Sequence, residues 1–379
     1  MGRRPELQAA HVTAVPSSPG RETERPSGPS RVAPPSLAEV AARVEARICA
    51  LVGDELARWS KVDAELAQPF EALRTLVAAG GKRLRPAFCH WAWVGAGGDP
   101  GDARVVDAGA ALELLHTFAL IHDDIMDGSS TRRGTDTIHV QFEATHATRG
   151  WRGEGRRFGE GVGILAGDLA FVYADQMLAG APRAAADVFT ELRIEVNLGQ
   201  YLDLVGTARG RVSEEAARRI SVFKSGKYTI ERPLHLGAAL AGRLDELAEP
   251  LSAYGLPLGE AFQLRDDLLG VFGDASVTGK PVGEDLREGK PTVLFACAAE
   301  RARGAEAAVL ERYGAPDLSD QEVRVLQQVL KDTGAVDQVE SSIDLLVSEA
   351  VLAIDDAPVT EEARQALAEL AWYVAGRDR

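Results

Sequence analysis

Two clusters of aspartates are the residues of this sequence whose types and spacing best suit chemistry. The first holds Asp123, Asp124 and Asp127, and the second holds Asp266 and Asp267. Both lie in apolar segments that predict helices, and buried carboxylates are costly unless a cation neutralises them. No block of lysines or arginines lies inside either cluster, so a divalent cation is the economical answer. Oxygen ligands favour Mg²⁺, which commonly keeps a phosphate as a further partner. The sequence therefore predicts an enzyme that holds a diphosphate between two acidic helices.

The first cluster fits metal binding better than it fits a solvated acidic helix end. Asp123 and Asp127 are four residues apart, so on a helix they share one face and can chelate a cation. Asp124 lies about 100° further round the helix and can reach a second cation or support the first pair. A solvated helix end predicts polar flanks, whereas the preceding segment contains Leu112, Leu114, Leu115, Phe118, Leu120 and Ile121.

The second cluster places an amide and two carboxylates on one helical stripe. Gln263 and Asp267 are four residues apart, and Asp266 follows Gln263 by three. The flanking residues are apolar, which argues against an ordinary surface face. Gly270 stands one turn after Asp266, where a third carboxylate would complete the pattern.

A basic, glycine-rich turn precedes the first cluster. Residues 80–86 read GGKRLRP and carry Lys82, Arg83 and Arg85, and Pro86 suits the first position of a helix. A phosphate can approach such a turn closely, with helix-terminal N–H groups nearby. The GxxxxGK[ST] pattern of a Walker A loop is absent from the sequence. Taken alone, the turn fits an anion site and a solvated turn equally well.

Two further basic groups are aligned with the first cluster. Arg132 and Arg133 follow it, and adjacent guanidinium groups suit bidentate contact with phosphate oxygens. His116 precedes Asp123 by two helical turns on the same face. A lone histidine on an apolar helix is more often a satisfied core residue, but this alignment favours a phosphate donor.

Three lysines complete the set of candidate phosphate ligands. Lys224 and Ser225 form a pair of lysine and hydroxyl, although such pairs are equally common on ordinary helix surfaces. Lys280 and Lys290 follow the second cluster. We expect these loop lysines to close over a phosphate once a metal is bound.

The composition limits the kinds of partner and compartment. The chain has 379 residues, 45% of them hydrophobic, and its net charge of −15 argues against nucleic acid as the main partner. Its three cysteines, Cys49, Cys89 and Cys297, are far apart and form no CxxC motif, which predicts reduced thiols in a cytoplasmic protein. No uninterrupted apolar run reaches the ~18 residues of a membrane span, so none is predicted.

The pattern of apolar residues predicts an all-α protein with one large helical domain. Residues 1–36 are rich in Pro, Ser and Arg and predict a disordered tail, whereas helical periodicity dominates residues 37–379. We expect about a dozen helices, with long ones at the centre. The longest surface loop is expected at residues 148–161. After a first helix from residue 37, the expected helical runs are 66–80, 86–96, 101–127, 161–181, 184–207, 213–229, 233–247, 250–272, 291–303, 320–333, 335–353 and 360–376.

In this order, the motifs resemble those of the trans-isoprenyl diphosphate synthases, also called the polyprenyl synthetase family. The matching segments are GGKRLRP, HTFALIHDDIMD, STRRG, GILAGD, GQYLD, FKS, FQLRDD and TGK…GEDLREGK, and the resemblance covers roughly residues 37–379. It implies a helical bundle around a central cavity, a homodimer, and a Mg²⁺-dependent enzyme. Such an enzyme condenses isopentenyl diphosphate with an allylic diphosphate in head-to-tail fashion.

The resemblance also implies roles for individual residues. Lys82, Arg85, His116 and Arg133 would bind isopentenyl diphosphate. Asp123 and Asp127, with support from Asp124, would hold Mg²⁺ on the allylic diphosphate, and Asp266 with Asp267 would serve the remaining Mg²⁺. The allylic diphosphate would also contact Arg132, Lys224, Ser225, Gln263 and Lys280. Two departures stand out: DDLLG lacks the last aspartate of the second motif, and Ser225 replaces the usual threonine.

The chain length of the product is expected to depend on the residues just before the first cluster. Phe118 lies five residues before Asp123, and Ala119 leaves space beside it. One aromatic residue at this position resembles synthases that make geranylgeranyl diphosphate, although Phe118 also fits an ordinary core position.

Several other functions remain as alternatives. They are a farnesyl or longer polyprenyl diphosphate synthase, a class I terpene cyclase and a non-catalytic subunit of a heteromeric synthase. The candidate isopentenyl diphosphate ligands argue against a cyclase, which needs no such site. The incomplete second motif, DDLLG, is the feature that favours a non-catalytic subunit.

Overall fold

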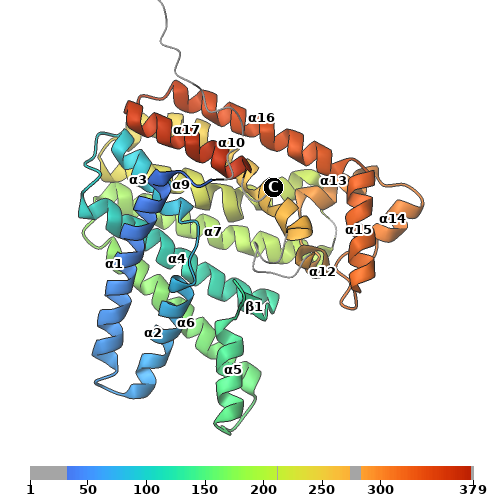
Figure 1. Ribbon diagram of the computed structural model, residues 1–379, viewed down its shortest axis with the longest axis horizontal. Helices are drawn as coiled ribbons and strands as arrows, with labels where there is room; N and C mark the ends of the chain where they lie inside the picture. Colours follow the sequence, from blue (N-terminus) through green and yellow to red (C-terminus); the bar gives the residue numbers. More distant parts are fainter. Residues whose placement is uncertain (1–31, 211, 274–282, 377–379) are drawn as a thin grey trace, which may run out of the picture.

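The described part of the chain is almost entirely helical, as predicted. The computed structural model describes residues 32–210, 212–273 and 283–376, and Figure 1 shows the helices packed as one bundle. The only sheet within these ranges pairs β1 (Thr131–Arg132) with β2 (Thr135–Asp136) in antiparallel register, with Thr131 opposite Asp136. The prediction of an all-α fold is therefore confirmed.

The helices follow one another along the whole described chain. η1 is a 3₁₀-helix and η2 is a π-helix that continues α8 into α9. The bounds are α1 (Pro35–Trp59), η1 (Ala64–Ala67), α2 (Gln68–Ala78), α3 (Leu84–Gly95), α4 (Ala103–Asp127), α5 (Ile138–Thr148), α6 (Gly155–Met177), α7 (Arg183–Arg209), α8 (Glu214–Ser221), η2 (Val222–Glu231), α9 (Arg232–Leu240), α10 (Leu244–Phe272), α12 (Glu284–Glu288), α13 (Val293–Arg301), α14 (Ala305–Leu310), α15 (Asp320–Asp332), α16 (Ala335–Asp355) and α17 (Glu361–Gly376).

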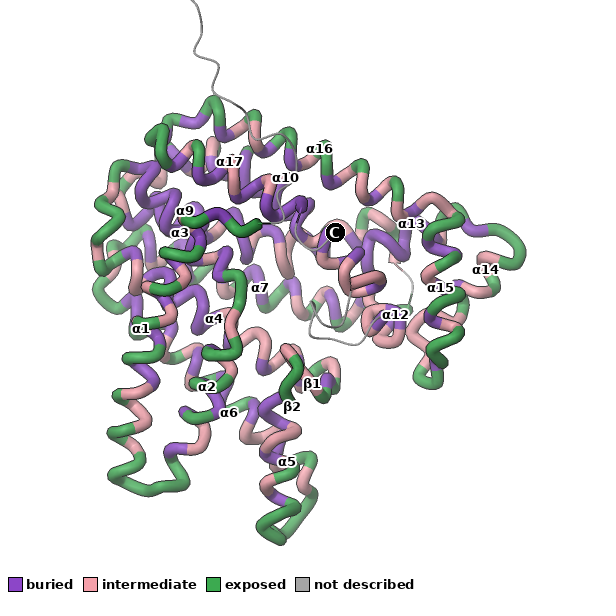
Figure 2. Tube along the Cα trace, viewed as in Figure 1, coloured by how far each residue is buried: buried purple, intermediate pink, exposed green. Residues whose placement is uncertain are grey.

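The core lies where α3, α9 and α10 pass through the middle of the bundle. Figure 2 shows these helices with many buried residues, and every residue of α9 from Pro233 to Leu240 is buried. Outer helices such as α1 bury one stripe only, at Leu37, Val40, Val44 and Ile48. This spacing is that of an amphipathic helix with one face on the core.

Two long helices position the acidic clusters. The first cluster forms the last turn of α4, because Gly128 adopts a left-handed conformation with φ of 68° and ends the helix directly after Asp127. The second cluster lies near the end of α10, which stops at Phe272. The carbonyl end of a helix carries partial negative charge. Both clusters therefore stand where extra negative charge is unfavourable without a cation.

The expected loop at 148–161 is wrong over most of its length. The chain is irregular at 149–154, but α6 already begins at Gly155, and the preceding helix α5 was not predicted. Gly159 in this segment serves close packing, because an ideal Cβ on it would overlap the carbonyl oxygen of His139 on α5. Glycine here lets two helices approach, so its usual meaning as a helix breaker misleads.

The expected break between helices 233–247 and 250–272 is also misplaced. α10 runs unbroken through Pro250 and Pro257, whereas the break falls at 241–243, where Gly242 has a φ of 72°. A proline weakens a helix locally, but packing on neighbouring elements can maintain it. Here α10 packs against α16, η2 and α9 along its length.

One described helix, α4, is long and apolar enough to cross a membrane by length and composition alone. Its most apolar window is 61% buried inside the bundle, as expected of a central helix. The predicted disordered tail at 1–36 falls mostly on residues outside those described, and α1 begins at Pro35.

Candidate active site

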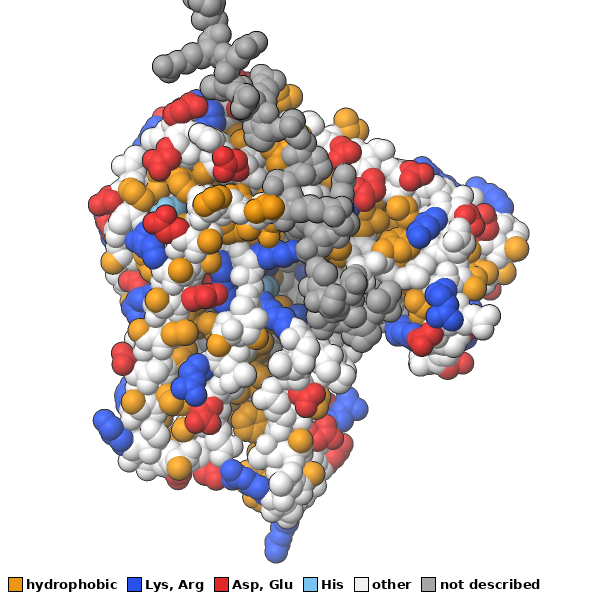
Figure 3. Space-filling model, in the orientation of Figure 1, with side chains coloured by type: hydrophobic (Ala, Val, Ile, Leu, Met, Phe, Trp, Pro, Cys, Tyr) orange, Lys and Arg blue, Asp and Glu red, His pale blue; other side chains and the backbone are white. Residues whose placement is uncertain are grey.

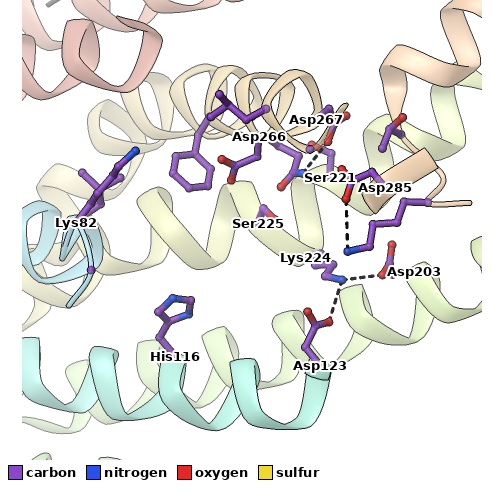
Figure 4. A pocket seen from close by; sticks show the side chains of 18 of the residues that line it. Lys82, His116, Asp123, Asp203, Ser221, Lys224, Ser225, Asp266, Asp267 and Asp285 are labelled. Carbon is purple, nitrogen blue, oxygen red and sulfur yellow. Dashed lines mark hydrogen bonds and ion pairs between the residues drawn. The ribbon is translucent and has the colours of Figure 1, made fainter. Parts of the chain in front are cut away.

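A cavity of about 800 Å³ between α4 and α10 collects most of the predicted site residues. Figure 4 shows Asp123 on one wall and Asp266 with Asp267 on the opposite wall. On the face drawn in Figure 3, Lys and Arg side chains gather around a hollow in the middle of the molecule. The predicted residues that line the cavity are Lys82, Arg85, His116, Asp123, Arg132, Arg133, Lys224, Ser225, Gln263, Asp266, Asp267 and Lys290.

Some predicted residues lie elsewhere. The residues that line the cavity do not include Asp124 and Asp127, nor Phe118 and Ala119. The ring of Phe118 instead packs against Phe171 of α6, with 4.9 Å between ring centroids. The predicted ligand Lys280 falls outside the described residues.

Lysines from distant segments neutralise the first cluster. Lys224 Nζ lies 3.3 Å from Asp123 Oδ1 and 2.6 Å from Asp203 Oδ2. Lys290 Nζ lies 3.4 Å from Asp127 Oδ2 and 2.8 Å from Glu288 Oε2. The carboxylates on the first wall therefore face cations brought from η2 and from the segment after α12.

The surroundings of Asp123 and Asp127 give the two carboxyl groups different pKa values. Burial acts to raise the pKa of Asp123, but Lys224, Lys290 and Arg132 lower it to about 2. Burial, together with the charge on Asp123, raises the pKa of Asp127 to about 6. Asp123 is thus the firmly ionised member of the pair.

Asp124 holds an arginine in place. Its two carboxylate oxygens accept hydrogen bonds from Arg132 Nε and Nη2 at 2.6–2.9 Å, and Asp124 itself is buried. This fork orients the guanidinium at the edge of the cavity. Asp124 therefore positions Arg132, and its expected support of a metal ion stays a prediction.

The carboxylate of Asp267 on the opposite wall accepts hydrogen bonds from other residues of the chain. Gln263 Nε2 donates to Asp267 Oδ1 at 2.8 Å, and the N–H of Val293, the first residue of α13, donates to Oδ2 at 3.3 Å. Burial raises the pKa of Asp267 to about 8, although the Gln263 hydrogen bond opposes this. Asp267 thus joins α10 to α13, and Asp266 is the more available carboxylate of the second cluster.

A basic group lies at the end of the cavity remote from Asp266. The guanidinium carbon of Arg85 lies 4.2 Å from the ring centroid of Tyr228, and Arg85 Nη2 donates to Thr229 Oγ1 at 2.9 Å. The hydroxyl of Tyr228 lies 3.1 Å from His116 Nδ1. Burial, with Arg85 and Arg133 nearby, lowers the pKa of His116 well below its usual value. His116 is therefore a neutral imidazole that can donate one hydrogen bond.

The three cations of residues 80–86 are not equivalent. Arg83 is almost fully buried, and its guanidinium donates to Glu113 at 2.6 Å, to Glu45 at 3.0 Å and to the carbonyl of Val77 at 2.7 Å. It has a φ of 49°, unusual for a residue with a side chain. Arg83 therefore anchors the turn that presents Lys82 and Arg85.

The carboxylate oxygens on both walls fit a divalent cation. A bound diphosphate would supply the remaining ligands of that cation. In the parts of the chain that are described, no group of three or more His, Cys, Asp and Glu side chains could hold a metal unaided. Asp127 Oδ2 is buried and accepts no hydrogen bond from the described residues. Hard oxygen donors in an incomplete set are typical of Mg²⁺ sites that share the ion with substrate phosphates.

Comparisons with known proteins decide the family. The family model described as polyprenyl synthetase matches residues 67–332. The chain belongs to the polyprenyl synthetase family. Geranylfarnesyl diphosphate synthase of Aeropyrum pernix is 33% identical over 80% of this chain and 92% of its own length. Geranylgeranyl diphosphate synthase of Methanosarcina mazei is 34% identical over 72% of this chain and 78% of its own.

Solved structures agree with this polyprenyl synthetase assignment. Geranylgeranyl pyrophosphate synthase from Corynebacterium glutamicum, complexed with isoprenyl diphosphate and magnesium, superposes with a TM-score of 0.85. It is 37% identical and covers 90% of this chain and 99% of its own. The chain is therefore a prenyltransferase that elongates isoprenyl diphosphates, and its family implies dependence on a divalent metal.

Sequence reasoning gave no role to several residues of this polyprenyl synthetase site. Gln200 Nε2 donates to Asp123 Oδ1 at 3.0 Å, and Asp203 binds Lys224. Gln200 and Asp203 are three residues apart on α7, so their shared face is a usable signal, but neither belongs to an acidic cluster. Tyr228 lies outside the quoted motifs and Asp285 lies within GEDLREGK, but only the fold places them beside His116 and Gly270.

Proposed function

We propose that this polyprenyl synthetase condenses isopentenyl diphosphate with an allylic diphosphate, with Mg²⁺ as its metal, and makes geranylgeranyl diphosphate. One observation carries the proposal. The cavity has an acidic region between Asp123 and Asp266 and a basic region around Lys82, Arg85 and His116. The first suits a diphosphate bound through metal, and the second suits a diphosphate bound directly by cations.

The side chains at the acidic end would promote loss of pyrophosphate from the allylic substrate. Bound Mg²⁺ supplies Lewis acidity toward the departing pyrophosphate. Lys224 and Arg132, both held by aspartates, add fixed positive charge where negative charge develops. Lys290 belongs to the same arrangement through Asp127.

The side chains at the basic end would hold the isopentenyl substrate so that its double bond attacks the allylic cation. Lys82, Arg85 and Arg133 would grip its diphosphate, and neutral His116 would donate one N–H. The proton released after attack would leave with pyrophosphate. Apolar lining residues such as Leu84, Phe262 and Leu269 exclude water, which would otherwise quench the cation.

The contact between Phe118 and Phe171 supports the assignment of geranylgeranyl diphosphate as the product. Phe118 lies five residues before Asp123 and so about 7.5 Å along the helix axis. Its ring also lies 4.5 Å from that of His122. This aromatic pair joins α4 to α6 outside the residues that line the cavity, so a role in product length requires the growing chain to extend beyond that lining toward α6.

Product analysis tests the proposed reaction. The purified chain is incubated with Mg²⁺, labelled isopentenyl diphosphate, and dimethylallyl, geranyl or farnesyl diphosphate in turn. The products are dephosphorylated and separated by length. Geranylgeraniol as the end product is the expected result. Farnesol or longer alcohols would retain the synthase and overturn the product length, and no elongation of any primer would contradict the proposed reaction.

An apolar surface supports the further proposal that the enzyme is a homodimer. We define the α6–α7 face by its exposed apolar residues, which are Ile164, Leu165, Val172, Ile194, Leu198, Tyr201 and Leu204, together with the half-buried Phe171. Phe171 of α6 and Leu198 of α7 line one shallow depression together. A contiguous exposed apolar face of this kind commonly marks a protein interface. We also propose that residues 37–379 form the catalytic domain of a cytoplasmic enzyme.

A further inference from the structure

The π-helix η2 keeps an unusual backbone register over ten residues. At its end, the N–H of Arg232 donates to the carbonyl oxygen of Lys227, five residues earlier, whereas an α-helix bonds residues four apart. π-helical turns are rare and occur mostly as single turns inside α-helices. A run of this length therefore depends on contacts with the surrounding elements.

One face of α7 supplies such contacts. Glu195, Gly199 and Asp203 follow one another at intervals of four, so they share a helix face, and all three are buried. An ideal Cβ on Gly199 would overlap the backbone nitrogen of Lys224. Asp203 binds the ammonium group of the same lysine, as Figure 4 shows. This stripe of α7 therefore lies along η2, and Glu195 is its third member.

Glu195 binds two cations at the end of η2. Lys227 Nζ lies 2.5 Å from Glu195 Oε1. Arg232 donates from Nε to Oε2 at 2.6 Å and from Nη2 to Oε1 at 2.7 Å. The side chain of Glu195 is only 6% exposed, so water competes little for these contacts. Burial acts to raise the pKa of Glu195, but hydrogen bonds from Arg232 and Lys227 lower it below its usual value, and the carboxylate is ionised.

The two cations can share one carboxylate because η2 is a π-helix. Residues five apart lie about 140° round an α-helix, so their side chains diverge. In a π-helix the hydrogen bonds link residues five apart, and such residues lie one above the other. Lys227 and Arg232 are also the pair whose backbone groups form a bond of this kind. The contact with Glu195 is thus specific to the π-helical register.

We propose that Glu195 is a positioning residue for prenyl transfer, which holds Lys227 and Arg232 together and so keeps η2 in the register that presents Lys224 to Asp123. If this turn relaxed to α-helical bonding, the residues before it would rotate relative to α9. Lys224 Nζ would then leave its place 3.3 Å from Asp123 Oδ1. Glu195 is not among the residues that line the cavity, so it acts through the helix. The inference rests on the proposed role of Lys224 in the loss of pyrophosphate.

Steady-state kinetics of the full chain with geranyl diphosphate, isopentenyl diphosphate and Mg²⁺ test the proposal. We expect Glu195→Gln to lower kcat about 10- to 100-fold, because a small misplacement of a catalytic group has effects of this size. The KM for isopentenyl diphosphate should stay unchanged, because its proposed ligands lie at the other end of the cavity. Asp107→Asn is the matched control. It neutralises a carboxylate that joins α4 to Arg47 of α1 at 2.6 Å, and it should leave kcat unchanged.

A double-mutant cycle distinguishes positioning from a general structural role. In a Lys224→Ala background, Glu195→Gln should cause little further loss of kcat, because its effect passes through Lys224. Equal losses in both backgrounds would overturn the proposal. Lys227→Gln removes one of the two cations and leaves the Arg232 contact in place, so it should lower kcat less and show the same dependence on Lys224. Circular dichroism and melting temperature establish which variants fold, and Lys227→Gln carries the test if Glu195→Gln does not.

The outcomes also separate this inference from the proposed function. Wild-type protein that elongates no primer would overturn both. Lys224→Ala with the kcat of wild type would refute the role of Lys224, and the positioning role of Glu195 with it. A slow Lys224→Ala beside a Glu195→Gln variant with the kcat of wild type would overturn only the role of Glu195, because Asp203 alone would then suffice to place the lysine.

Discussion

Arg83 shows that a basic residue inside a predicted phosphate-binding motif can serve the fold. Both its side chain and that of Glu113 are 3% exposed, and the two are joined at 2.6 Å. Removal of one member of a buried ion pair leaves the other charge uncompensated, which is strongly destabilising. The turn that carries Lys82 and Arg85 depends on this pair.

We predict that Arg83→Met lowers the free energy of unfolding by about 3–5 kcal/mol, because it strands the charge of Glu113. The measurement is urea unfolding followed by circular dichroism. The double variant Arg83→Met/Glu113→Leu should recover most of the loss. A single variant as stable as wild type would contradict the anchoring role.

Phe118 gives a prediction about product length. Phe118→Ala removes the ring that packs on Phe171 and should lengthen the product, as read by chromatography of the dephosphorylated alcohols. Ala119→Phe adds an aromatic ring at the neighbouring position and should shorten it. An unchanged product from both variants would remove this pair as the determinant of length.

At the scale of single residues, the sequence predicted the types of residue in the site better than it predicted the contacts between them. The spacing of Asp123 and Asp127 sufficed for the acidic cluster, because i and i+4 residues share a helix face. The inward turn of Arg83 and the position of Asp285 beside Gly270 depend on residues distant in the chain. No local pattern encodes such contacts.

The π-helix η2 is the element that brings Lys224 and Ser225 to the cavity. It passes α10 at a contact between two glycines: an ideal Cβ on Gly259 would lie 2.6 Å from Cα of Gly226. π-helical turns are rare and frequently occur at functional sites. The two elements that carry Lys224 and Asp266 can approach so closely because both residues at their crossing are glycine.

We predict that Gly259→Ala destabilises the protein by about 1–3 kcal/mol, because the added methyl group meets backbone that cannot move aside cheaply. The control is Gly53→Ala on α1, the same substitution at a position where nothing lies within 4 Å of the added Cβ. Enzyme activity should fall more in Gly259→Ala than in this control. Melting temperature and steady-state rates of both variants provide the measurement, and equal behaviour would contradict a tight crossing.

Element boundaries were predictable where glycine and proline break helices, and misleading where they serve packing. The α4 helix was predicted almost to its ends, because Gly128 acts as an ordinary C-terminal cap. Gly159 permits contact between α5 and α6, and Pro250 lies within α10. The same residue types thus have opposite meanings, and tertiary packing decides between them.

At the scale of the whole molecule, the α6–α7 face is an apolar surface that the described part of the chain leaves exposed. Leu198 on this face is 53% exposed. Burial of such a surface against a second copy would stabilise the assembly through the hydrophobic effect. Net charge and composition could not predict this, because the exposed apolar residues are spread along two separate helices.

We predict that Leu198→Glu converts a dimer into a monomer, because it places a charge at the centre of the α6–α7 face. Size-exclusion chromatography with light scattering measures the mass in solution. Leu345→Glu alters a residue of α16 that is 72% exposed and should leave the mass unchanged. Retention of a dimer by Leu198→Glu, or a monomeric wild type, would refute the assignment of this face.

Gly270 determines how closely the end of α10 can approach the turn of α12. An ideal Cβ on Gly270 would overlap Oδ2 of Asp285, so a larger residue at position 270 requires the Asp285 side chain or its turn to move. Because both residues line the cavity, the width of this end of the cavity depends on a side chain that is absent.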